Sequence, residues 1–457
     1  MLLWFRNDLR VQDNPALAYA LENGAKSAIF FVSEKQWRIH HWSDIKIDFI
    51  LRHAELLKSQ LETLGIALNI VTADTFIDQV NYLTDHFAGQ TLVVNEELEL
   101  NEKLRDSQLV DAGFNLVSFE SDVIVPKGRV LNKSGEMFKV FTPFKRAWLS
   151  FVRQNGFEFI DSPKIHEDFS HLAPSEGSTA PKSSSKWPLA NEFTQNVLPN
   201  FMRFKLAGYA DSRDIPSVKG TSGISAYLAI GAISPRYLLV LLLNQHPDLL
   251  SEQPANCFSW LNELIWREFY RHLLFHFPDL IKGGDFNEKY KQLPWPNDKA
   301  KLDAWQQGKT GYPIVDAAMN QLNQTGWMHN RLRMIVASFL TKHLLVDWRL
   351  GEEYFAKRLI DYDFSANNGG WQWSAGTGCD AQPYFRIFNP LTQSQKFDPT
   401  GKFIRKYLPE LAGVPDKYIH FPHEYLKREG QSNIYWPALV EHKTAREEAL
   451  AFYKQYL

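Results

Sequence analysis

Apolar positions follow a strand-and-helix alternation over residues 1 to about 125. Five short apolar runs are separated by stretches in which apolar residues recur at helical spacing. Asp13-Asn14-Pro15 with Gly24, and Ser43 with Gly65, are start and stop signals for two of these helices. The pattern predicts a doubly wound parallel sheet, whose ligands bind beyond the carboxyl ends of the strands. The predicted strands are LLWF (2–5), SAIFFV (27–32), ALNIV (67–71), TLVVN (91–95) and NLVSFE (115–120).

The pattern changes after this region. Residues from about 160 to 190 are rich in Ser, Pro and Lys and predict an irregular surface connection, and the periodicity is then helical nearly to the end. We therefore expect an α/β domain at 1–128, an interdomain connection at 129–194 and a large all-α domain at 195–457.

Neither of two nucleotide-binding signatures is complete. No G-x-G-x-x-G follows the first strand, so any cofactor of the first domain must be held by other means. GKTGYP at 308–313 resembles the end of a P-loop, but Asp303 occupies the place of its first glycine.

Composition narrows the class of protein. The 457 residues include only two cysteines, Cys257 and Cys379, which have no metal-ligand spacing, so neither a disulfide framework nor a metal site is expected. The first residues lack the apolar core of a signal peptide, and no run reaches the roughly 20 apolar residues of a membrane span. A soluble, cytoplasmic protein is expected. The formal charge of −2 excludes indiscriminate coating of nucleic acid but not one basic groove.

The stretch DYDFSANNGGWQW, 361–373, concentrates polar chemistry. It combines two carboxylates, two amides, the Gly369-Gly370 pair and two tryptophans, a mixture that suits neither an amphipathic helix nor a strand. Such groups can hydrogen-bond and stack on a planar heterocycle. The alternative is a turn with two core tryptophans.

Two helical stretches carry similar chemistry. In 258–277, Glu263, Trp266, Arg267 and Tyr270 share one face, while a second face is apolar through Leu261, Leu264, Ile265 and Phe269. His272 and His276 lack a third metal ligand, so packing is expected for them. Hydroxyls and backbone amides also gather in GTSGIS, 220–225, just before an apolar run, which predicts either an anion site or an ordinary helix cap.

The stretch 326–340 predicts a helix with Trp327, Asn330, Arg331 and Met334 on one face. Arg333 lies two residues from Arg331 and points about 160° away, so the two arginines must have different partners. We assign Arg331 to phosphate or base contacts and Arg333 to a carboxylate of 361–373, with Asp361 favoured. The alternative is surface ion pairs of little energetic weight.

These motifs together resemble the photolyase/cryptochrome flavoprotein family, and within it the bacterial class I cyclobutane pyrimidine dimer photolyases with a folate antenna. The resemblance covers nearly the whole chain. It rests on WFRNDLR (4–10), GTSGIS, WLNELIWREFYR, KTGYPIVDAAM, TGWMHNRLRM, the 361–373 stretch and YFRIFNP (384–390).

The resemblance implies an all-α FAD-binding domain, with reduced FADH⁻ as the working form. Asn367 matches the residue that faces flavin N5, while Gly223 departs from relatives that carry an arginine there. The implied FAD-binding residues are Tyr209, Thr221, Ser222, Gly223, Ile224, Ser225, Trp260, Glu263, Arg267, Arg333, Asp361, Tyr362, Asp363 and Asn367.

The implied reaction is light-driven repair of pyrimidine dimers that are flipped out of duplex or single-stranded DNA. Trp266 and Trp373 match the indoles that grip the dimer, with Glu263, Asn330 and Met334 in the same pocket. Glu263, if it holds or shares a proton, would stabilise the electron-rich pyrimidines. DNA contacts are implied for Arg213, Glu263, Trp266, Arg267, Tyr270, Asn330, Arg331 and Gln393.

The resemblance implies two further sites. Trp371, Trp348 and Trp295, in that order outward, match an electron relay to the flavin, although their spacing alone favours core positions. His40, Asn101, Glu102 and Lys282 match residues that hold a 5,10-methenyltetrahydrofolate antenna. A monomer is expected, without membrane association and nucleoid-associated when bound to DNA.

Three alternatives remain at this level. A cryptochrome photoreceptor acting through protein partners often carries a long C-terminal extension, whereas this chain stops at Leu457. A (6-4) photoproduct enzyme would place histidines where Asn330 and Met334 stand. An unrelated flavoprotein would leave the paired arginines and exposed indoles unexplained.

Overall fold

A computed structural model describes residues 1–161, 163, 183–251 and 258–456. These residues form two compact units. The first unit comprises Met1–Ala207, Ser222–Ile281 and Ile360–Ser365. The second comprises Gly208–Thr221, Lys282–Leu359 and Ala366–Leu457. Most of the predicted surface connection at 160–190 lies outside the described residues.

The first unit is built on a five-stranded parallel sheet in the order β3-β2-β1-β4-β5. All five predicted strands are confirmed. Central β1 is completely buried and pairs with β2 through Leu3 opposite Ala28 and with β4 through Leu2 opposite Leu92. The direction of strand order reverses between β1 and β4, which opens a crevice at their carboxyl ends. The strands are β1 (Leu2–Phe5), β2 (Ser27–Val32), β3 (Ala67–Thr72), β4 (Thr91–Asn95) and β5 (Asn115–Phe119).

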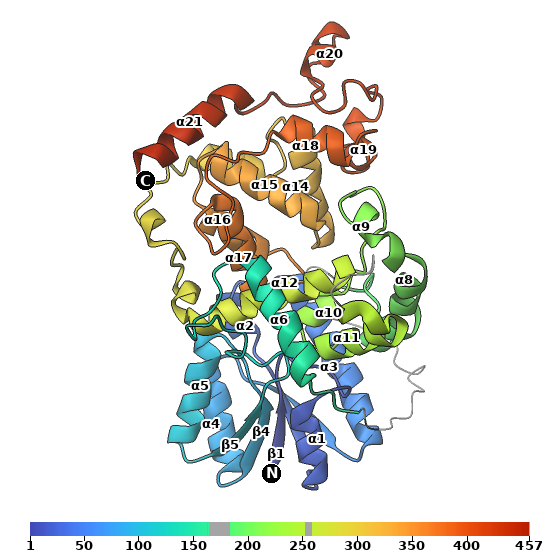
Figure 1. Cartoon of the computed structure of the whole chain (residues 1–457), viewed down its shortest axis with the longest axis vertical. Coiled ribbons are helices and arrows are strands. Elements are labelled where there is room, and N and C mark those ends of the chain that lie inside the picture. The colour runs from blue at the N-terminus through green and yellow to red at the C-terminus, as the bar shows by residue number, and fades with distance from the viewer. Residues whose placement is uncertain (162, 164–182, 252–257, 457) are drawn as a thin grey trace. The chain divides into compact units, whose positions relative to one another are not determined.

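Helices cover both faces of this sheet, with α1 and α3 on one face and α4 and α5 on the other (Figure 1). The predicted start signals are confirmed: Asn14 accepts from the backbone N–H of Leu17 at 3.0 Å, and Ser43 accepts from that of Lys46 at 3.2 Å. Gly24 and Gly65 follow the two helix ends with positive φ. The helices are α1 (Pro15–Glu22), α2 (Glu34–Ile39), α3 (Asp44–Thr63), α4 (Phe76–Phe87) and α5 (Leu100–Asp111).

The remaining helices of the first unit follow the sheet in sequence. The predicted helix over 258–277 is confirmed as α12, and its apolar-face residues Leu261, Leu264, Ile265 and Phe269 are all buried. Helix α6 packs against α12. These helices are α6 (Phe141–Asn155), α7 (Ala190–Glu192), α8 (Leu198–Phe204), α10 (Ser225–Ala229), α11 (Pro235–Gln245) and α12 (Phe258–His276).

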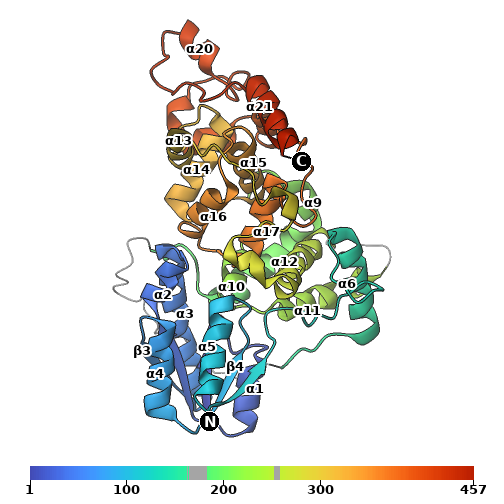
Figure 2. The same cartoon turned by 90° about the vertical axis from the view of Figure 1, so that its left-hand side faces the viewer.

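The second unit is helical, and its helices α14 and α15 pack side by side (Figure 1 and Figure 2). Within it, GKTGYP forms the turn before α14, with Pro313 at the first helical position. Its helices are α9 (Tyr209–Ser212), α13 (Lys299–Gln306), α14 (Pro313–Thr325), α15 (Asn330–Lys342), α16 (Trp348–Ala356), α18 (Pro390–Phe397), α19 (Lys402–Tyr407), α20 (His423–Arg428) and α21 (His442–Gln455).

The alternative that 361–373 forms a turn is wrong, because Phe364–Ala375 forms α17, a helix that is not amphipathic. Its polar side chains are buried: Gln372 donates to Asn368 at 2.9 Å and to the carbonyl of Gly284 at 3.2 Å, and accepts from the N–H of Phe286 at 2.8 Å. A helix that buries a hydrogen-bonded polar face has no amphipathic pattern, and these contacts offset the low helix propensity of Gly369-Gly370.

The predicted single helix over 326–340 is also corrected. Gly326, with φ of 70°, ends α14 in the left-handed conformation, and the side chain of His329 caps the start of α15 at Asn330. Trp327 therefore lies in the connection between two helices and does not share a helical face with Arg331.

Candidate functional site

The loop before α10 brings hydroxyl groups next to α12 and the 361–363 segment, all within the first unit. Ser225 begins α10 and donates its hydroxyl to Asp361 at 2.7 Å. Trp260 of α12 donates its indole N–H to the hydroxyl of Ser222 at 3.3 Å. Gly223 has φ of 72°, a conformation that side chains other than glycine rarely adopt. The predicted gathering of hydroxyls at a helix start is confirmed.

The polar and aromatic face predicted on α12 is observed. Glu263, Trp266, Arg267 and Tyr270 are each partly exposed, in contrast to the buried opposite face. Arg267 donates to the carbonyl of Asp122 at 2.6 Å. The expected packing role of His272 is confirmed, since it is fully buried with Nε2 3.1 Å from the carbonyl of Val125. Among the described residues no group of three His, Cys, Asp or Glu could hold a metal ion.

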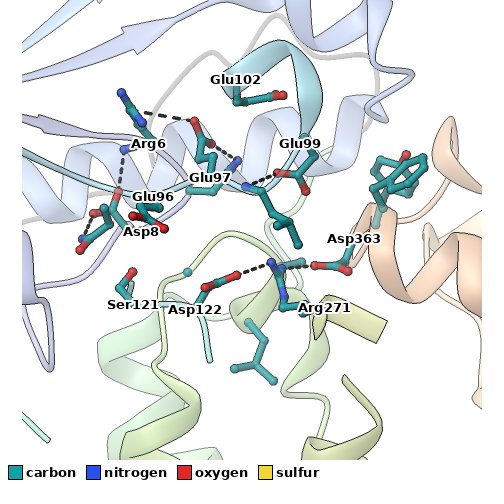
Figure 3. Close-up of a pocket in the computed structure, with 18 of the residues that line it drawn as sticks. Arg6, Asp8, Glu96, Glu97, Glu99, Glu102, Ser121, Asp122, Arg271 and Asp363 are labelled. Carbon is teal, nitrogen blue, oxygen red and sulfur yellow. Dashed lines mark hydrogen bonds and ion pairs between the residues drawn. The ribbon is translucent and has the colours of Figure 1, made fainter. Parts of the chain in front are cut away.

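A cavity of about 260 Å³ lies at the carboxyl ends of β1, β4 and β5 (Figure 3). Its walls come from the segments that follow these strands, from the start of α3 and from α12. All of its lining residues belong to the first unit. Labelled members are Arg6, Asp8, Glu96, Glu97, Glu99, Glu102, Ser121, Asp122, Arg271 and Asp363.

Arg271 connects three segments at the edge of this cavity. It donates to Asp122 at 2.6 Å and pairs with Asp363 of the 361–363 segment (Figure 3). Burial by itself raises the pKa of Asp122, but the charges of Lys127, Arg271 and Arg267 outweigh it and hold that pKa well below its usual range. The carboxylate of Asp122 is therefore ionised at neutral pH.

The predicted antenna residues of the first unit lie together in this cavity. The amide nitrogen of Asn101 is 3.0 Å from Nε2 of His40, and Nδ1 of His40 is 3.5 Å from Glu102. Burial, and then the neighbouring Glu99 and Glu97, raise the pKa of Glu102 well above its usual value. Oε2 of Glu102 has no hydrogen-bond partner among the described residues, so it can bind a ligand donor.

Lys46 is a cavity residue that our sequence analysis missed. It is buried, lies 3.9 Å above the ring of Trp42 and donates to the carbonyl of Tyr362 at 2.9 Å. Burial lowers its pKa to about 8. Lys46 lies in the first turn of α3, after the cap residue Ser43, and belongs to no sequence motif that would mark it as a ligand-binding residue. Our sequence analysis also missed Glu96 and Glu97. They directly follow β4, and the rule that ligands bind beyond the carboxyl ends of parallel strands would have found them.

In the second unit, α16 orients the neighbouring amides of α17. Asn367 donates its amide to the backbone carbonyl of Glu352 at 3.1 Å, and Asn368 donates to the carboxyl of Glu352 at 3.0 Å. Burial raises the pKa of Glu352 to about 7. This bond uses one of the two N–H groups of the Asn367 amide, and the second N–H and the oxygen can each meet a ligand.

Two predicted DNA-contacting arginines share a carboxylate in the second unit. Arg331 pairs with Asp214 at 2.9 Å and lies 4.4 Å above the ring of Phe397, and Arg213 approaches Asp214 to 4.0 Å. Arg333 donates Nε to the carbonyl of Met328 at 2.8 Å. The prediction that Arg331 and Arg333 have different partners is confirmed, and the pairing of Arg333 with Asp361 stays a prediction.

The three predicted relay tryptophans differ in exposure. Trp371 in α17 and Trp348 in α16 are buried, whereas Trp295 is partly exposed, and the order of the three in a relay stays a prediction. Trp348 donates its indole N–H to the buried Asp285 at 2.9 Å. Trp371 requires Gly351, because a Cβ at that position would lie 2.2 Å from the Trp371 ring.

The other predicted residues of the second unit are found on several elements. Asn330 and Met334 lie on α15, Trp373 on α17 and Gln393 on α18, while Tyr209 begins α9. Lys282 and Thr221 also belong to this unit. All of these residues belong to the second unit. That they form one site with residues of the first unit stays a prediction.

The fold combines a doubly wound α/β part with a largely helical part. Residues 1–163 match the family described as DNA photolyase, and residues 260–455 match the FAD-binding domain of DNA photolyase. The chain is 45% identical to the deoxyribodipyrimidine photo-lyase of Escherichia coli, over 99% of this chain and 98% of that protein. It is 44% identical to that of Vibrio cholerae, over 99% of both. The chain therefore belongs to the DNA photolyase family and contains that family's FAD-binding domain.

Solved structures agree with this membership. A class III photolyase from Agrobacterium tumefaciens is 34% identical, with a TM-score of 0.79 and coverage of 100% of this chain and 97% of that one. A photolyase from Sulfolobus tokodaii, solved with two FAD molecules, is 28% identical with a TM-score of 0.79 over 99% of both chains. A Synechocystis cryptochrome is 26% identical with a TM-score of 0.83, over 99% of this chain and 98% of that one.

Proposed function

We propose that this protein repairs cyclobutane pyrimidine dimers in DNA with the energy of absorbed light, as a deoxyribodipyrimidine photo-lyase. The observation that carries the proposal is the 45% identity to such an enzyme over 99% of the chain. The partly exposed face of α12, which offers a carboxylate, an indole, a guanidinium and a phenol, supports it. No helix among the described residues is long and apolar enough to cross a membrane.

The residues present suit FAD. In the first unit, the hydroxyl of Ser222, which accepts from Trp260, suits donation to a phosphate oxygen, and Arg267 and the 361–363 segment suit the rest of the cofactor. When bound and reduced, FAD supplies the electron that light transfers to the dimer. In the second unit, the amide of Asn367 would hydrogen-bond flavin N5, with its free N–H when N5 is bare and with its oxygen when N5 is protonated.

The chain's own residues bind and orient the DNA in this proposal. Trp266 and Trp373 stack on the flipped dimer, while Glu263, Asn330 and Met334 contact its polar edges and methyl groups. Arg213, Arg331 and Gln393 contact the phosphate backbone, with Arg267 and Tyr270 beside the dimer. Asp214 holds Arg213 and Arg331 in place before DNA arrives. Because phosphate contacts release counterions, affinity should fall as salt rises.

We further propose 5,10-methenyltetrahydrofolate as the antenna, held by His40, Asn101, Glu102 and Lys282. Glu102 offers an acceptor to the N–H groups of a pterin ring. The Sulfolobus relative was solved with two FAD molecules, so a second flavin is the alternative chromophore to test. Extraction of the bound chromophores, followed by chromatography and mass spectrometry, distinguishes a folate from a flavin.

A photoreceptor function is the second candidate, because the chain also resembles a cryptochrome at 26% identity. A test for light-dependent repair of damaged DNA distinguishes a photo-lyase from a photoreceptor. We expect purified protein under near-ultraviolet or blue light to restore an oligonucleotide that carries one thymine dimer, and to be inactive in the dark. Chromatography of the oligonucleotide before and after illumination measures this. Bound reduced flavin without any light-dependent repair would contradict the proposal and favour the photoreceptor.

Replacing Trp371 with Phe is expected to block photoreduction of the oxidised flavin, because phenylalanine is far harder to oxidise than buried tryptophan. Repair by protein whose flavin is already chemically reduced should stay near the wild-type rate. Absorption spectra under illumination with an external reductant measure the first effect, and a repair assay under anaerobic conditions measures the second. Trp305→Phe, which alters a neighbouring ring 6.0 Å from Trp371, is the control and should retain photoreduction. Loss of both activities in Trp371→Phe would contradict separate roles.

A further inference from the structure

Helix α6 presents a row of large apolar side chains to α12. Phe141, Phe144, Trp148 and Val152 recur at helical spacing and are all buried, with exposed fractions of 5% or less. The helices pack against one another within the first unit (Figure 1). At the N-terminal end of α6, Phe141 contacts Trp266, which lies on the partly exposed face of α12.

Phe141 covers one face of the Trp266 indole. The two rings are parallel to within 7° and their centroids are 3.6 Å apart. The other neighbours of Trp266 contact it less directly: Phe269 meets it edge-on at 5.7 Å, and Tyr270 is tilted by 32° at 5.7 Å. Trp266 itself stays partly exposed. A planar ligand that stacks on this indole can therefore use only the face opposite Phe141.

A buried carboxylate fixes the position of α6 two turns further along. Glu268 of α12 is completely buried and accepts from the indole N–H of Trp148 at 2.5 Å. It also accepts from the backbone N–H of Val125 at 3.3 Å and from that of Ile124. Because Trp148 and Phe141 lie seven residues apart on one helix face, this anchor also holds the Phe141 ring in place.

We propose that Phe141 is a positioning residue for recognition of the damaged bases. It immobilises the Trp266 ring before DNA binds, so that the indole loses little side-chain freedom when the dimer stacks on the face opposite Phe141. The inference rests on the proposed function, in which Trp266 contacts the dimer. The inference adds Phe141 as a second aromatic ring behind Trp266, and this second ring does not itself touch the substrate.

The test measures affinity and repair separately in Phe141→Leu and Phe141→Met, two apolar variants without the ring. Dissociation constants are measured in the dark with an oligonucleotide that carries one thymine dimer and with the same sequence undamaged. We expect binding of the damaged strand to weaken roughly three- to tenfold. Undamaged binding, flavin content and repair per absorbed photon in the saturated complex should stay unchanged. Phe144→Leu is the matched control, because Phe144 packs against Phe269 and His272 and should leave both affinities unchanged.

A double-mutant cycle with Trp266→Ala identifies the pathway of the effect. If Phe141 acts through Trp266, Phe141→Leu will have no further effect on affinity once the indole has been removed. An equal weakening in the wild-type and Trp266→Ala backgrounds would overturn the proposal, as would unchanged affinity in Phe141→Leu beside a large loss in Trp266→Ala. If Trp266→Ala alone leaves dimer affinity unchanged, the proposed contact between Trp266 and the dimer fails, and the role of Phe141 fails with it.

Discussion

Replacing Arg271 with Met is expected to lower the free energy of unfolding by ~3–5 kcal/mol, because two carboxylates lose a buried partner. Arg271 is 8% exposed and pairs with both Asp122 and Asp363. Asp363 belongs to the proposed cofactor segment, so flavin should also be lost more readily. Urea unfolding and the ratio of flavin to protein after gel filtration measure the two effects.

The loss of stability in Arg271→Met should depend on pH, because the pKa of Asp122 is shifted downward. Its pKa is held below the ordinary value, so its ion pairs stabilise the fold above that ordinary value, and this stabilisation is lost as pH falls. The difference between wild type and Arg271→Met should therefore be largest at neutral pH and shrink on acidification. Arg38→Met is the control, because Arg38 pairs with Asp44 at 2.7 Å on the surface and its removal should change stability little. A difference that grows on acidification would contradict this account.

Replacing Asp316 with Ala is expected to destabilise the second unit by a similar ~3–5 kcal/mol, because it removes the acceptor of several buried donors at once. The carboxylate is completely buried and accepts from Thr310 through its N–H at 2.7 Å and its hydroxyl at 2.6 Å, and from the N–H of Gly311 at 3.0 Å. It also accepts from Tyr435 at 2.6 Å and Trp436 at 2.7 Å.

Asp316 thus fastens the chain around Tyr435 to the start of α14, and its loss should free the C-terminal part of the unit. Limited proteolysis followed by mass spectrometry should show cleavage between α20 and α21 in Asp316→Ala under conditions in which wild type is intact. Asp303→Ala, which removes an exposed partner of Lys299, is the control and should behave like wild type. Wild-type urea unfolding and protease resistance in Asp316→Ala would show that Asp316 does not hold this segment.

The α/β half of the fold could be predicted because its signals are local. Each strand is a short apolar run, and helix caps such as Asn14 and Ser43 bond to residues three positions away, so the relevant contacts are contained in a few consecutive residues. The polar and aromatic face of α12 was predictable for the same reason, since helical spacing alone places Glu263, Trp266, Arg267 and Tyr270 together.

Helix α17 was not predicted because distant residues supply its hydrogen bonds. Gln372 and Asn368 are partners of Gly284, Phe286 and Glu352, and only those partners allow a polar, glycine-containing segment to form the buried helix α17. Trp327 was misplaced because the helix was predicted to begin at Gly326, whose left-handed backbone ends α14, whereas α15 begins at Asn330.

The sequence by itself determined the class of fold, the family and the side-chain chemistry of each site, because residue identities, spacing and periodicity are properties of neighbouring positions. Only the tertiary structure decided which groups meet: Glu102 with His40, Arg271 between Asp122 and Asp363, and Phe141 against Trp266. These contacts join residues 62 to 149 positions apart, and packing, rather than any local preference, brings them within reach of one another.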